Sequence, residues 1–328
     1  MKKIAFICPY FGKLPNYFPL VLQSMKLNSN IDWIIFTDDK TKYEYPLNVK
    51  VYYMNLNELK ILIKKKISFI EEITPYKLCD FKPFYGIIFK TYLEKYDFWG
   101  FCDFDCIFGD LNKFITEDIL NKYKKIFFLG HLSLFANNHE IENILLNLLN
   151  TKKCQMYLKL NTSIFQLDEI MVPGLLRKNG IEIYQDSDNV IADICCTKKP
   201  FKICSEYLSY DKGNIIMKGN VIDNEGLVFS YINGKLIGYF LEEDTIYQKE
   251  YMYIHLQKRN MEFLNNINTD FLIIPNKFIP YRKVNKQLLK ISAKSPFIYK
   301  KRWKISWNYK INPIKRKIKI LKYKIFDE

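Results

Sequence analysis

The stretch from Phe98 to Asp110 constrains the fold most, because in it an apolar strand ends in two acids. Residues 98–102 carry no charge, which predicts a strand buried on both faces. Asp103 and Asp105 follow at a spacing of two, so in extended backbone both side chains leave the same face. Paired carboxylates repel each other, and burial makes both charges costly, so we expect a cation or another partner to neutralise them. Mg²⁺ and Mn²⁺ prefer such oxygen ligands. The alternative is a structural strand followed by an acidic turn.

Length and composition indicate a globular chain with a large core. It has 328 residues, of which 48% are hydrophobic and 16% aromatic. No apolar run approaches the roughly 20 residues needed to span a bilayer. The apolar run near the N-terminus stops at Pro9, so we interpret it as the first strand rather than a signal peptide. The eight cysteines show no metal-finger spacing, and we expect reduced thiols in a cytosol.

The net charge of +15 is concentrated at one end of the chain. Residues 281–328 hold 16 Lys or Arg against 2 acids, whereas the other 280 residues hold 34 (50 minus 16) against 33 (35 minus 2). We therefore predict a neutral body, residues 1–280, with a basic tail, residues 281–328.

Hydrophobic periodicity predicts a parallel α/β half, residues 1–130, followed by a mixed-sheet half, residues 131–280. Asn233-Gly234 is typical of a hairpin turn between two of the later strands. The predicted strands cover residues 3–8, 31–36, 98–102, 125–129, 181–184, 190–194, 215–218, 227–231, 236–241 and 251–255. The predicted helices cover residues 17–27, 56–73, 83–95, 140–149, 168–178, 257–264 and 283–292.

Three charged residues lie just before a predicted helix that begins with proline. Lys77, Asp80 and Lys82 occupy a position where free N–H groups and the helix dipole favour anions, so a phosphate partner is one interpretation. A solvated polar loop is the other.

The order of these motifs resembles nucleotide-sugar glycosyltransferases of the GT-A fold. The resemblance covers roughly residues 3–260. The combination of Pro-Tyr-Phe-Gly at 9–12, Lys-Leu-Cys-Asp-Phe-Lys-Pro at 77–83 and Asp-Phe-Asp at 103–105 is similar to proteins of bacterial capsular-polysaccharide clusters. It implies a GT-A-like (Rossmann-like) fold, with a mixed, mainly parallel sheet flanked by helices. It also implies transfer of a sugar from a UDP-sugar to a growing surface glycan, with Mn²⁺ or Mg²⁺ as cofactor.

The resemblance also implies roles for individual residues. Asp105 would be the main metal ligand, with Asp103 shared between the metal and the ribose. Asp80 and Lys82 would lie beside the nucleotide, with Lys77 as a further phosphate partner. Lys82 stands where related families often have Arg, which keeps the charge but loses the bidentate geometry. The uridine would contact two strand ends, formed by Pro9, Tyr10, Phe11 and Gly12 and by Thr37, Asp38 and Asp39.

A late histidine resembles the third metal ligand of many such enzymes. His255 ends a predicted strand, and Lys258 and Arg259 follow where a basic residue would contact the diphosphate. The Gly and Lys-Pro that follow this histidine in glycogenin-like enzymes are absent. The alternative is a histidine of the core.

Further candidates come from position alone. Asp168 and Glu169 begin a predicted helix and could face the acceptor as a general base or hydroxyl ligand, or simply complement the helix dipole. His131, Ser133 and Asn137 could line a sugar pocket. Cys102 and Cys106 flank the acids, but a thiolate–metal site is disfavoured because alternation places them away from the carboxylates.

The tail combines helical apolar spacing with lysines and two tryptophans. This pattern indicates a peripheral anchor on an anionic membrane through residues 300–325, on the inner face of the cell membrane, where lipid-linked acceptors lie. A nucleic-acid-binding arm and a helix packed on the body are the alternatives.

Two other function classes compete with the glycosyltransferase. A haloacid-dehalogenase-like phosphatase also ends a buried strand in Asp-x-Asp, with the first acid as nucleophile. That class places Thr or Val two residues after the second acid, where this chain has Ile107, and it places the motif near the N-terminus. A non-catalytic basic protein bound to membranes or nucleic acid is disfavoured by the neutral body.

Overall fold

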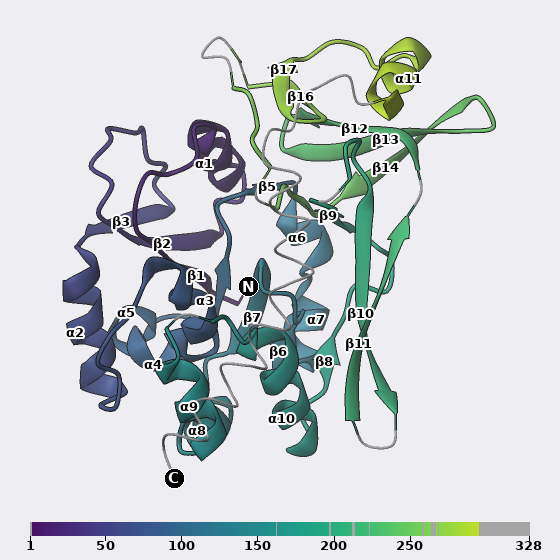
Figure 1. Ribbon diagram of the computed structural model, residues 1–328. Helices are drawn as coiled ribbons and strands as arrows, with labels where there is room; N and C mark the ends of the chain where they lie inside the picture. The colour runs from purple at the N-terminus through teal and green to yellow at the C-terminus, as the bar shows by residue number, and fades with distance from the viewer. Residues whose placement is uncertain are drawn as a thin grey trace. The chain divides into compact units, whose positions relative to one another are not determined.

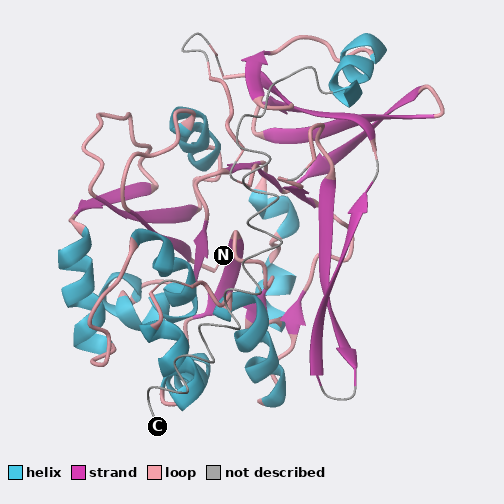
Figure 2. Ribbon diagram, viewed as in Figure 1, coloured by secondary structure: helices cyan, strands magenta, loops and turns pink. Residues whose placement is uncertain are grey.

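Two units make up the chain in the computed structural model (Figure 1). The structure describes residues 2–161, 163–196, 198–211, 214–222, 224–257, 259–263, 267 and 269–294. Unit 1 comprises Met1–Ile191, Glu206–Asn220 and Met252–His255, and unit 2 comprises Ala192–Ser205, Val221–Tyr251 and Leu256–Glu328. Each unit contains both helix and sheet, so the fold class is mixed α/β (Figure 2).

The first apolar segments of unit 1 assemble into a seven-stranded mixed sheet of order β3-β2-β1-β4-β7-β6-β8. β1 pairs parallel with β2 and β4, β2 pairs parallel with β3, and β6 pairs parallel with β8. β7 is antiparallel to both β4 and β6. The strands are β1 (Ile4–Tyr10), β2 (Ile31–Thr37), β3 (Val49–Tyr53), β4 (Phe98–Cys102), β6 (Lys125–Ile126), β7 (Leu132–Ala136) and β8 (Ile183–Tyr184).

The central strands are buried along their whole apolar runs, as expected for a sheet covered by helices. α4 contacts β4, and α8 contacts α9 and α10. The helices of unit 1 are α1 (Phe18–Lys26), α2 (Leu56–Lys66), α3 (Leu78–Phe81), α4 (Tyr85–Ile88), α5 (Lys90–Leu93), α6 (Leu111–Phe114), α7 (Glu117–Lys122), α8 (His139–Leu149), α9 (Lys152–Lys159) and α10 (Val172–Lys178). Two 3-10 turns, Pro75–Lys77 and Lys82–Phe84, and a π-helical turn, Leu167–Met171, complete the set.

Several predicted helices are shorter or broken. The helix predicted over 56–73 ends at Lys66, because Ile67 leaves the helical conformation and residues 67–73 bury their isoleucines as irregular chain. The helix predicted over 83–95 is interrupted at Phe89, and Gly86 lies directly against Trp99. The strand predicted over 125–129 stops at Ile126, because Phe127 has a φ of 57°.

The chain continues from β4 into a short antiparallel strand pair. β5 (Cys106–Phe108) follows β4 after a three-residue turn and pairs with β15 (Tyr253–His255). The register places His255 opposite Cys106 and Tyr253 opposite Phe108. Two segments about 150 residues apart in sequence therefore meet beside the acidic turn.

Unit 2 contains a five-stranded antiparallel sheet of order β14-β13-β12-β16-β17. The predicted hairpin at Asn233-Gly234 is confirmed, with φ values of 49° and 80°. α11 packs on β12, where Gly226 allows the backbone of Leu289 to approach closely. The elements are β12 (Glu225–Ile232), β13 (Lys235–Glu242), β14 (Thr245–Tyr251), β16 (Phe271–Ile274), β17 (Lys277–Pro280) and α11 (Lys286–Lys294).

β9 (Ile191–Ile194) pairs antiparallel with β10 (Ile203–Asp211), and β11 (Asn214–Ile222) follows. The helix predicted over 257–264 is wrong for its described residues, because Gln257 has a φ of 41° and Glu262 forms a bridge with Lys277.

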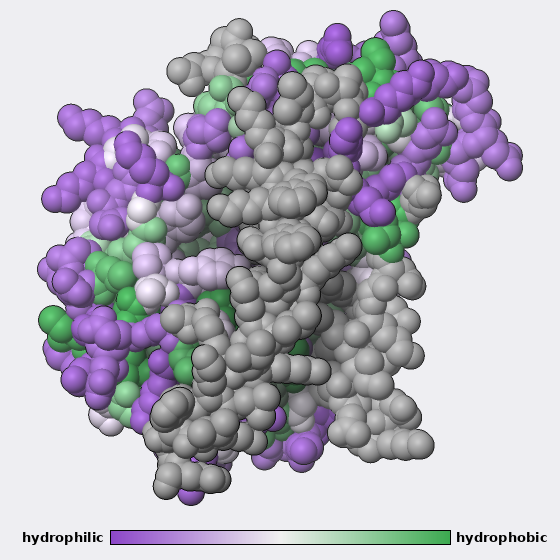
Figure 3. All heavy atoms as spheres, viewed as in Figure 1, coloured by the Kyte–Doolittle hydropathy of each residue, from purple (hydrophilic) through white to green (hydrophobic). Residues whose placement is uncertain are grey.

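The visible surface at the β13–β14 hairpin is mainly hydrophilic (Figure 3). Within the described ranges, no helix is both long and apolar enough to cross a membrane. Residues 300–325 of the predicted anchor lie outside the described residues.

Candidate functional site

The ends of three parallel strands define one edge of the unit 1 sheet. β1, β2 and β4 run in the same direction, so the loops after Tyr10, Thr37 and Cys102 leave at the same edge. β1 lies between β2 on one side and β4 on the other, and successive connections therefore turn in opposite directions from it. Such a switch point is where open α/β sheets bind ligands.

Two acids and a histidine converge at this edge. One ligand atom each from Asp103, Asp105 and His255 lie within 4.8 Å of one another. The turn from β4 to β5 carries both acids, and β15 brings His255 beside them through its pairing with Cys106. All three residues belong to unit 1.

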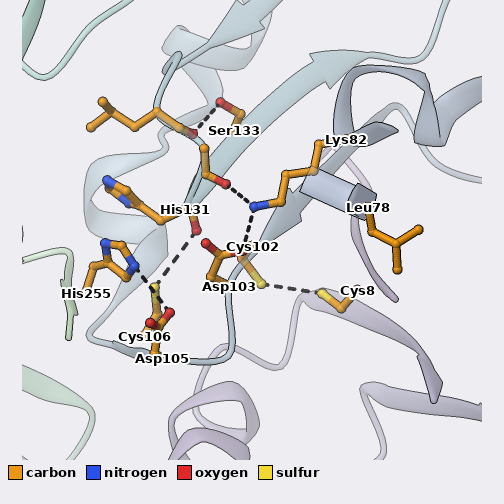
Figure 4. A network of polar contacts seen from close by, with 12 residues as sticks. Cys8, Leu78, Lys82, Cys102, Asp103, Asp105, Cys106, His131, Ser133 and His255 are labelled. Atoms are coloured by element: carbon orange, nitrogen blue, oxygen red, sulfur yellow. Dashed lines mark hydrogen bonds and ion pairs between the residues drawn. The ribbon is translucent and has the colours of Figure 1, made fainter. Parts of the chain in front are cut away.

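Each acid is paired with a different basic side chain (Figure 4). Lys82 Nζ lies 2.6 Å from Asp103 Oδ1, and His255 Nε2 lies 3.2 Å from Asp105 Oδ1. The Asp103 side chain is 36% exposed and that of Asp105 is 25% exposed, whereas His255 is buried. The carboxylates therefore keep a face toward solvent, while Lys82 and the His255 imidazole contact them from the protein side.

The donor set fits a divalent cation. Two carboxylates and one imidazole are hard or borderline ligands, which suit Mn²⁺ or Mg²⁺ rather than a soft metal. Cys102 lies 3.5 Å, sulfur to sulfur, from Cys8, and burial raises the pKa of the Cys102 thiol well above its usual value. All eight cysteines are free, and no candidate cation group among the described residues includes one.

His255 is oriented by a neighbouring ring. The His131 imidazole stacks on it with ring centroids 4.3 Å apart, and His131 Nδ1 lies 2.7 Å from the Tyr253 hydroxyl. The backbone N–H of Asp103 also donates to the carbonyl of His131, at 3.0 Å. His131 therefore supports the acidic turn and the imidazole together, which its position in the sequence did not indicate.

Lys82 lies deeper than Asp103. Its Nζ donates to the Gly130 carbonyl at 2.8 Å as well as to Asp103. Burial by itself lowers the pKa of Lys82, but the neighbouring carboxylates of Asp103 and Asp168 outweigh it and hold the pKa well above its usual value. The side chain is therefore a charged ammonium.

Asp168 and Glu169 reach the same region through Gly130. They lie on the π-helical turn Leu167–Met171, a local irregularity that is frequent at functional sites. Glu169 Oε1 accepts a hydrogen bond from the Gly130 N–H at 2.9 Å. A Cβ on Gly130 would lie 2.8 Å from Glu169 Oε1 and 2.9 Å from Asp168 Oδ2. Burial, and then the neighbouring Glu169 carboxylate, raise the pKa of Asp168 well above its usual value.

The two strand-end loops are tied to each other. Asp38 Oδ1 accepts from the Gly12 N–H at 2.7 Å, and Asp39 Oδ2 accepts from the Leu14 N–H at 3.0 Å. Asp39 Oδ1 also accepts from the Thr41 hydroxyl, and this hydrogen bond is the main reason that its pKa is lowered. Asp39 therefore shapes the loop, whereas Asp38 is exposed beside it.

The remaining residues of these loops surround the acidic turn. The Tyr10 ring packs against Phe104, with centroids 5.6 Å apart. Burial, and then the carboxylates of Asp105 and Asp103, raise the pKa of Tyr10. Pro9 is half-buried, Phe11 and Thr37 are buried, and Gly12 has a φ of 100°.

Lys77 and Asp80 form an internal pair instead of facing this edge. Both side chains are fully buried, and Lys77 Nζ lies 2.8 Å from Asp80 Oδ2. The Lys77 ammonium also donates to the carbonyls of Tyr157 and Ser163, and Asp80 accepts from the Phe165 N–H. The pair fixes the chain that leads into Asp168.

Of the two basic residues predicted after His255, Arg259 belongs to unit 2. Arg259 is buried, stacks on Phe201 and donates to the carbonyls of Lys199 and Pro200 and to Asn276 Oδ1. These contacts make it an anchor for residues 199–201. Lys258 lies outside the described residues.

The segment 130–137 contains strand β7, which separates its three predicted pocket residues. Leu132 pairs with Cys102 and Ala136 with Phe98, so Asn137 lies at the opposite end of β4 from Asp103. Ser133 is fully buried and donates to the Leu129 carbonyl. Only His131 of the three reaches the site. Gly130 was missed, because nothing local distinguishes it from an ordinary turn glycine.

Comparison with known families decides the chain's membership. Residues 6–282 match the sequence profile of a family described as a family of unknown function (DUF6625). The protein belongs to this family. The match includes every candidate site residue from Pro9 to Arg259 and ends before residue 283. No curated protein matches the sequence.

Proposed function

We propose that the protein is a metal-dependent glycosyltransferase that moves a sugar from a UDP-sugar to a growing surface glycan. The observation that carries the proposal is the convergence of Asp103, Asp105 and His255 within 4.8 Å at the switch point of the sheet. A nucleoside diphosphate needs a cation at that position, because its charge has to be neutralised when the glycosidic bond breaks.

Asp103, Asp105 and His255 would hold Mn²⁺ or Mg²⁺, which would stabilise the negative charge that develops on the UDP leaving group. The loops after β1 and β2 would hold the uridine, as the resemblance to GT-A enzymes implies. Asp38 supports this assignment, since its carboxylate is exposed and fixed by the Gly12 N–H at 2.7 Å.

Asp168 and Glu169 would act on the sugar side. Their carboxylates are held beside Gly130, whose carbonyl binds Lys82. The two acids differ in setting, because Asp168 is buried with a raised pKa whereas Glu169 is half-buried and holds hydrogen bonds from Gly130 and Gln166. Such a difference supports separate roles, in which one of the two acids would take the proton that the acceptor hydroxyl loses, or would bind that hydroxyl, and the other would hold Gly130 in place.

A lipid-linked acceptor at the inner face of the cell membrane remains part of the proposal, on the basis of the basic sequence 300–325. Sedimentation with vesicles of phosphatidylglycerol, using the full chain and a chain ending at residue 294, tests it. Equal sedimentation of the two chains would contradict attachment through this segment.

The central experiment is calorimetric titration of UDP into the full-length protein, with and without Mn²⁺. We compare the wild type with Asp105→Asn, and with Asp118→Asn as a matched control on the exposed surface of α7. We expect Mn²⁺-dependent binding of UDP, weakened by more than about 100-fold in Asp105→Asn, since even losing a residue that supports a ligand costs about 10- to 100-fold.

The control variant should bind as the wild type does. Failure of the wild type to bind UDP with any divalent cation would refute the proposal. A phosphatase assay would then be the next measurement, because a phosphatase also uses an acid at the end of a buried strand.

A further inference from the structure

The Lys82 ammonium is held by three defined contacts beside the candidate cation site. Its side chain is 10% exposed, and its ammonium lies 2.6 Å from Asp103 Oδ1 and 2.8 Å from the Gly130 carbonyl oxygen. The same ammonium lies 5.5 Å from the centre of the Phe101 ring. Two of these three partners are fixed parts of neighbouring strands and turns, so the ammonium stays in place when the Asp103 carboxylate turns to another ligand.

We propose that Lys82 is an internal counter-ion, which neutralises Asp103 in the free protein and makes the divalent cation and the nucleoside diphosphate bind cooperatively. The proposal rests on the proposed function and deepens it. It assigns Lys82 a positioning role through Asp103.

The charges explain the cooperativity. Asp103, Asp105 and Lys82 together carry one net negative charge when His255 is neutral. A divalent cation would leave the site with a net positive charge, and Lys82 would repel the cation at short range. A diphosphate group supplies the missing negative charge, so each ligand lowers the cost of binding the other. Such coupling is reciprocal for the two affinities.

A merely structural role leads to a different result. If Lys82 only held Gly130 and Asp103 in place, its removal would disorder a ligand and weaken cation binding. If it is a counter-ion, its removal strengthens binding of the cation alone. The sign of the change therefore separates the two roles.

The test measures Mn²⁺ binding to the full-length protein by electron paramagnetic resonance of free Mn²⁺, without nucleotide and then with saturating UDP. The variants are Lys82→Gln, which keeps a hydrogen-bond donor, and Lys82→Met. Lys90→Met is the matched control, because Lys90 also lies 2.6 Å from a carboxylate, that of Glu142, but belongs to no candidate site.

We expect Lys82→Gln to bind Mn²⁺ alone at least about tenfold more tightly than the wild type, because a like charge is removed at short range. UDP should raise the Mn²⁺ affinity of the wild type at least about tenfold and that of Lys82→Gln by clearly less. Lys90→Met should behave as the wild type in both measurements.

Unchanged or weaker Mn²⁺ binding by a folded Lys82→Gln would overturn the counter-ion role. The wild type supplies a second test that needs no variant, because equal Mn²⁺ affinity with and without UDP also overturns it. A wild type that binds neither Mn²⁺ nor UDP would refute the proposed function as well. Binding of both without a gain in Lys82→Gln would refute only the counter-ion role.

Discussion

The buried pair of Lys77 and Asp80 leads to a prediction about stability rather than ligand binding. Both side chains have 0% exposure, and their charged atoms lie 2.8 Å apart. The Lys77 ammonium also donates to two carbonyls, at 2.6 and 3.0 Å, and Asp80 accepts from the Phe165 N–H at 2.8 and 3.1 Å. Replacing Lys77 by Met leaves a carboxylate buried without its counter-charge.

The expected cost follows from this loss of compensation. Breaking a buried ion pair by removing one partner costs about 3–5 kcal/mol in the free energy of unfolding. For a domain of about 150–250 residues, each kcal/mol lowers the melting temperature by about 2–4 °C, so Lys77→Met should lower it by about 6–20 °C. Burial already raises the pKa of Asp80, while Lys77 opposes this shift. Without Lys77, the pKa of Asp80 in the folded protein rises further. The variant therefore loses stability as pH rises through this pKa, because the buried carboxyl then has to ionise without a counter-charge.

Thermal unfolding followed by circular dichroism at pH 5 and pH 8 measures both effects. Lys77→Met should lose more stability at pH 8 than at pH 5, and adding Asp80→Asn should restore part of it, because the orphan charge is removed. Lys90→Met, which breaks an exposed pair, should change the free energy of unfolding by less than about 1 kcal/mol. An unchanged melting temperature in Lys77→Met, together with weaker UDP binding, would refute this reasoning and return Lys77 to the ligand site.

Two further predictions concern the carboxylates around Gly130. Burial and the Glu169 carboxylate raise the pKa of Asp168 in the folded protein. The free energy of unfolding of the wild type should therefore fall, relative to that of Asp168→Asn, as pH rises from 3.8 through this raised pKa, by up to about 1.4 kcal/mol per pH unit. Urea unfolding at several pH values measures this fall, and parallel pH profiles of the two proteins would contradict the prediction. Gly130→Ala should fold but lose sugar-transfer activity, because its Cβ displaces the ends of two carboxylate side chains. Gly100→Ala should unfold, because its Cβ would lie 2.2 Å from the Ser133 carbonyl oxygen, which belongs to the backbone. Equal losses in the free energy of unfolding of the two variants would contradict this difference.

Local pattern was enough to locate the acidic turn and much of the core. The apolar run 98–102 predicted the buried strand that the structure contains, and Asp103 and Asp105 follow it directly. The two acids lie on the turn between β4 and β5, however, so the turn brings them together and not the alternation of extended backbone from which we expected it. The strands predicted over 3–8 and 31–36 form at 4–10 and 31–37, and the hairpin predicted at Asn233-Gly234 forms too, because period and turn chemistry are local properties. Broken helices such as 83–95 were not foreseeable, since their ends depend on packing against β4.

Only the tertiary structure decided which charged residues share a site. Lys77 and Lys82 lie five residues apart in one polar stretch, yet Lys77 forms an ion pair with Asp80 in the interior, whereas Lys82 forms one with Asp103. His255 joins the acids because β15 pairs with β5 in one register, and a slip of one residue would turn its imidazole to the other face. Pairing of this kind depends on contacts between distant segments, which composition and periodicity do not encode.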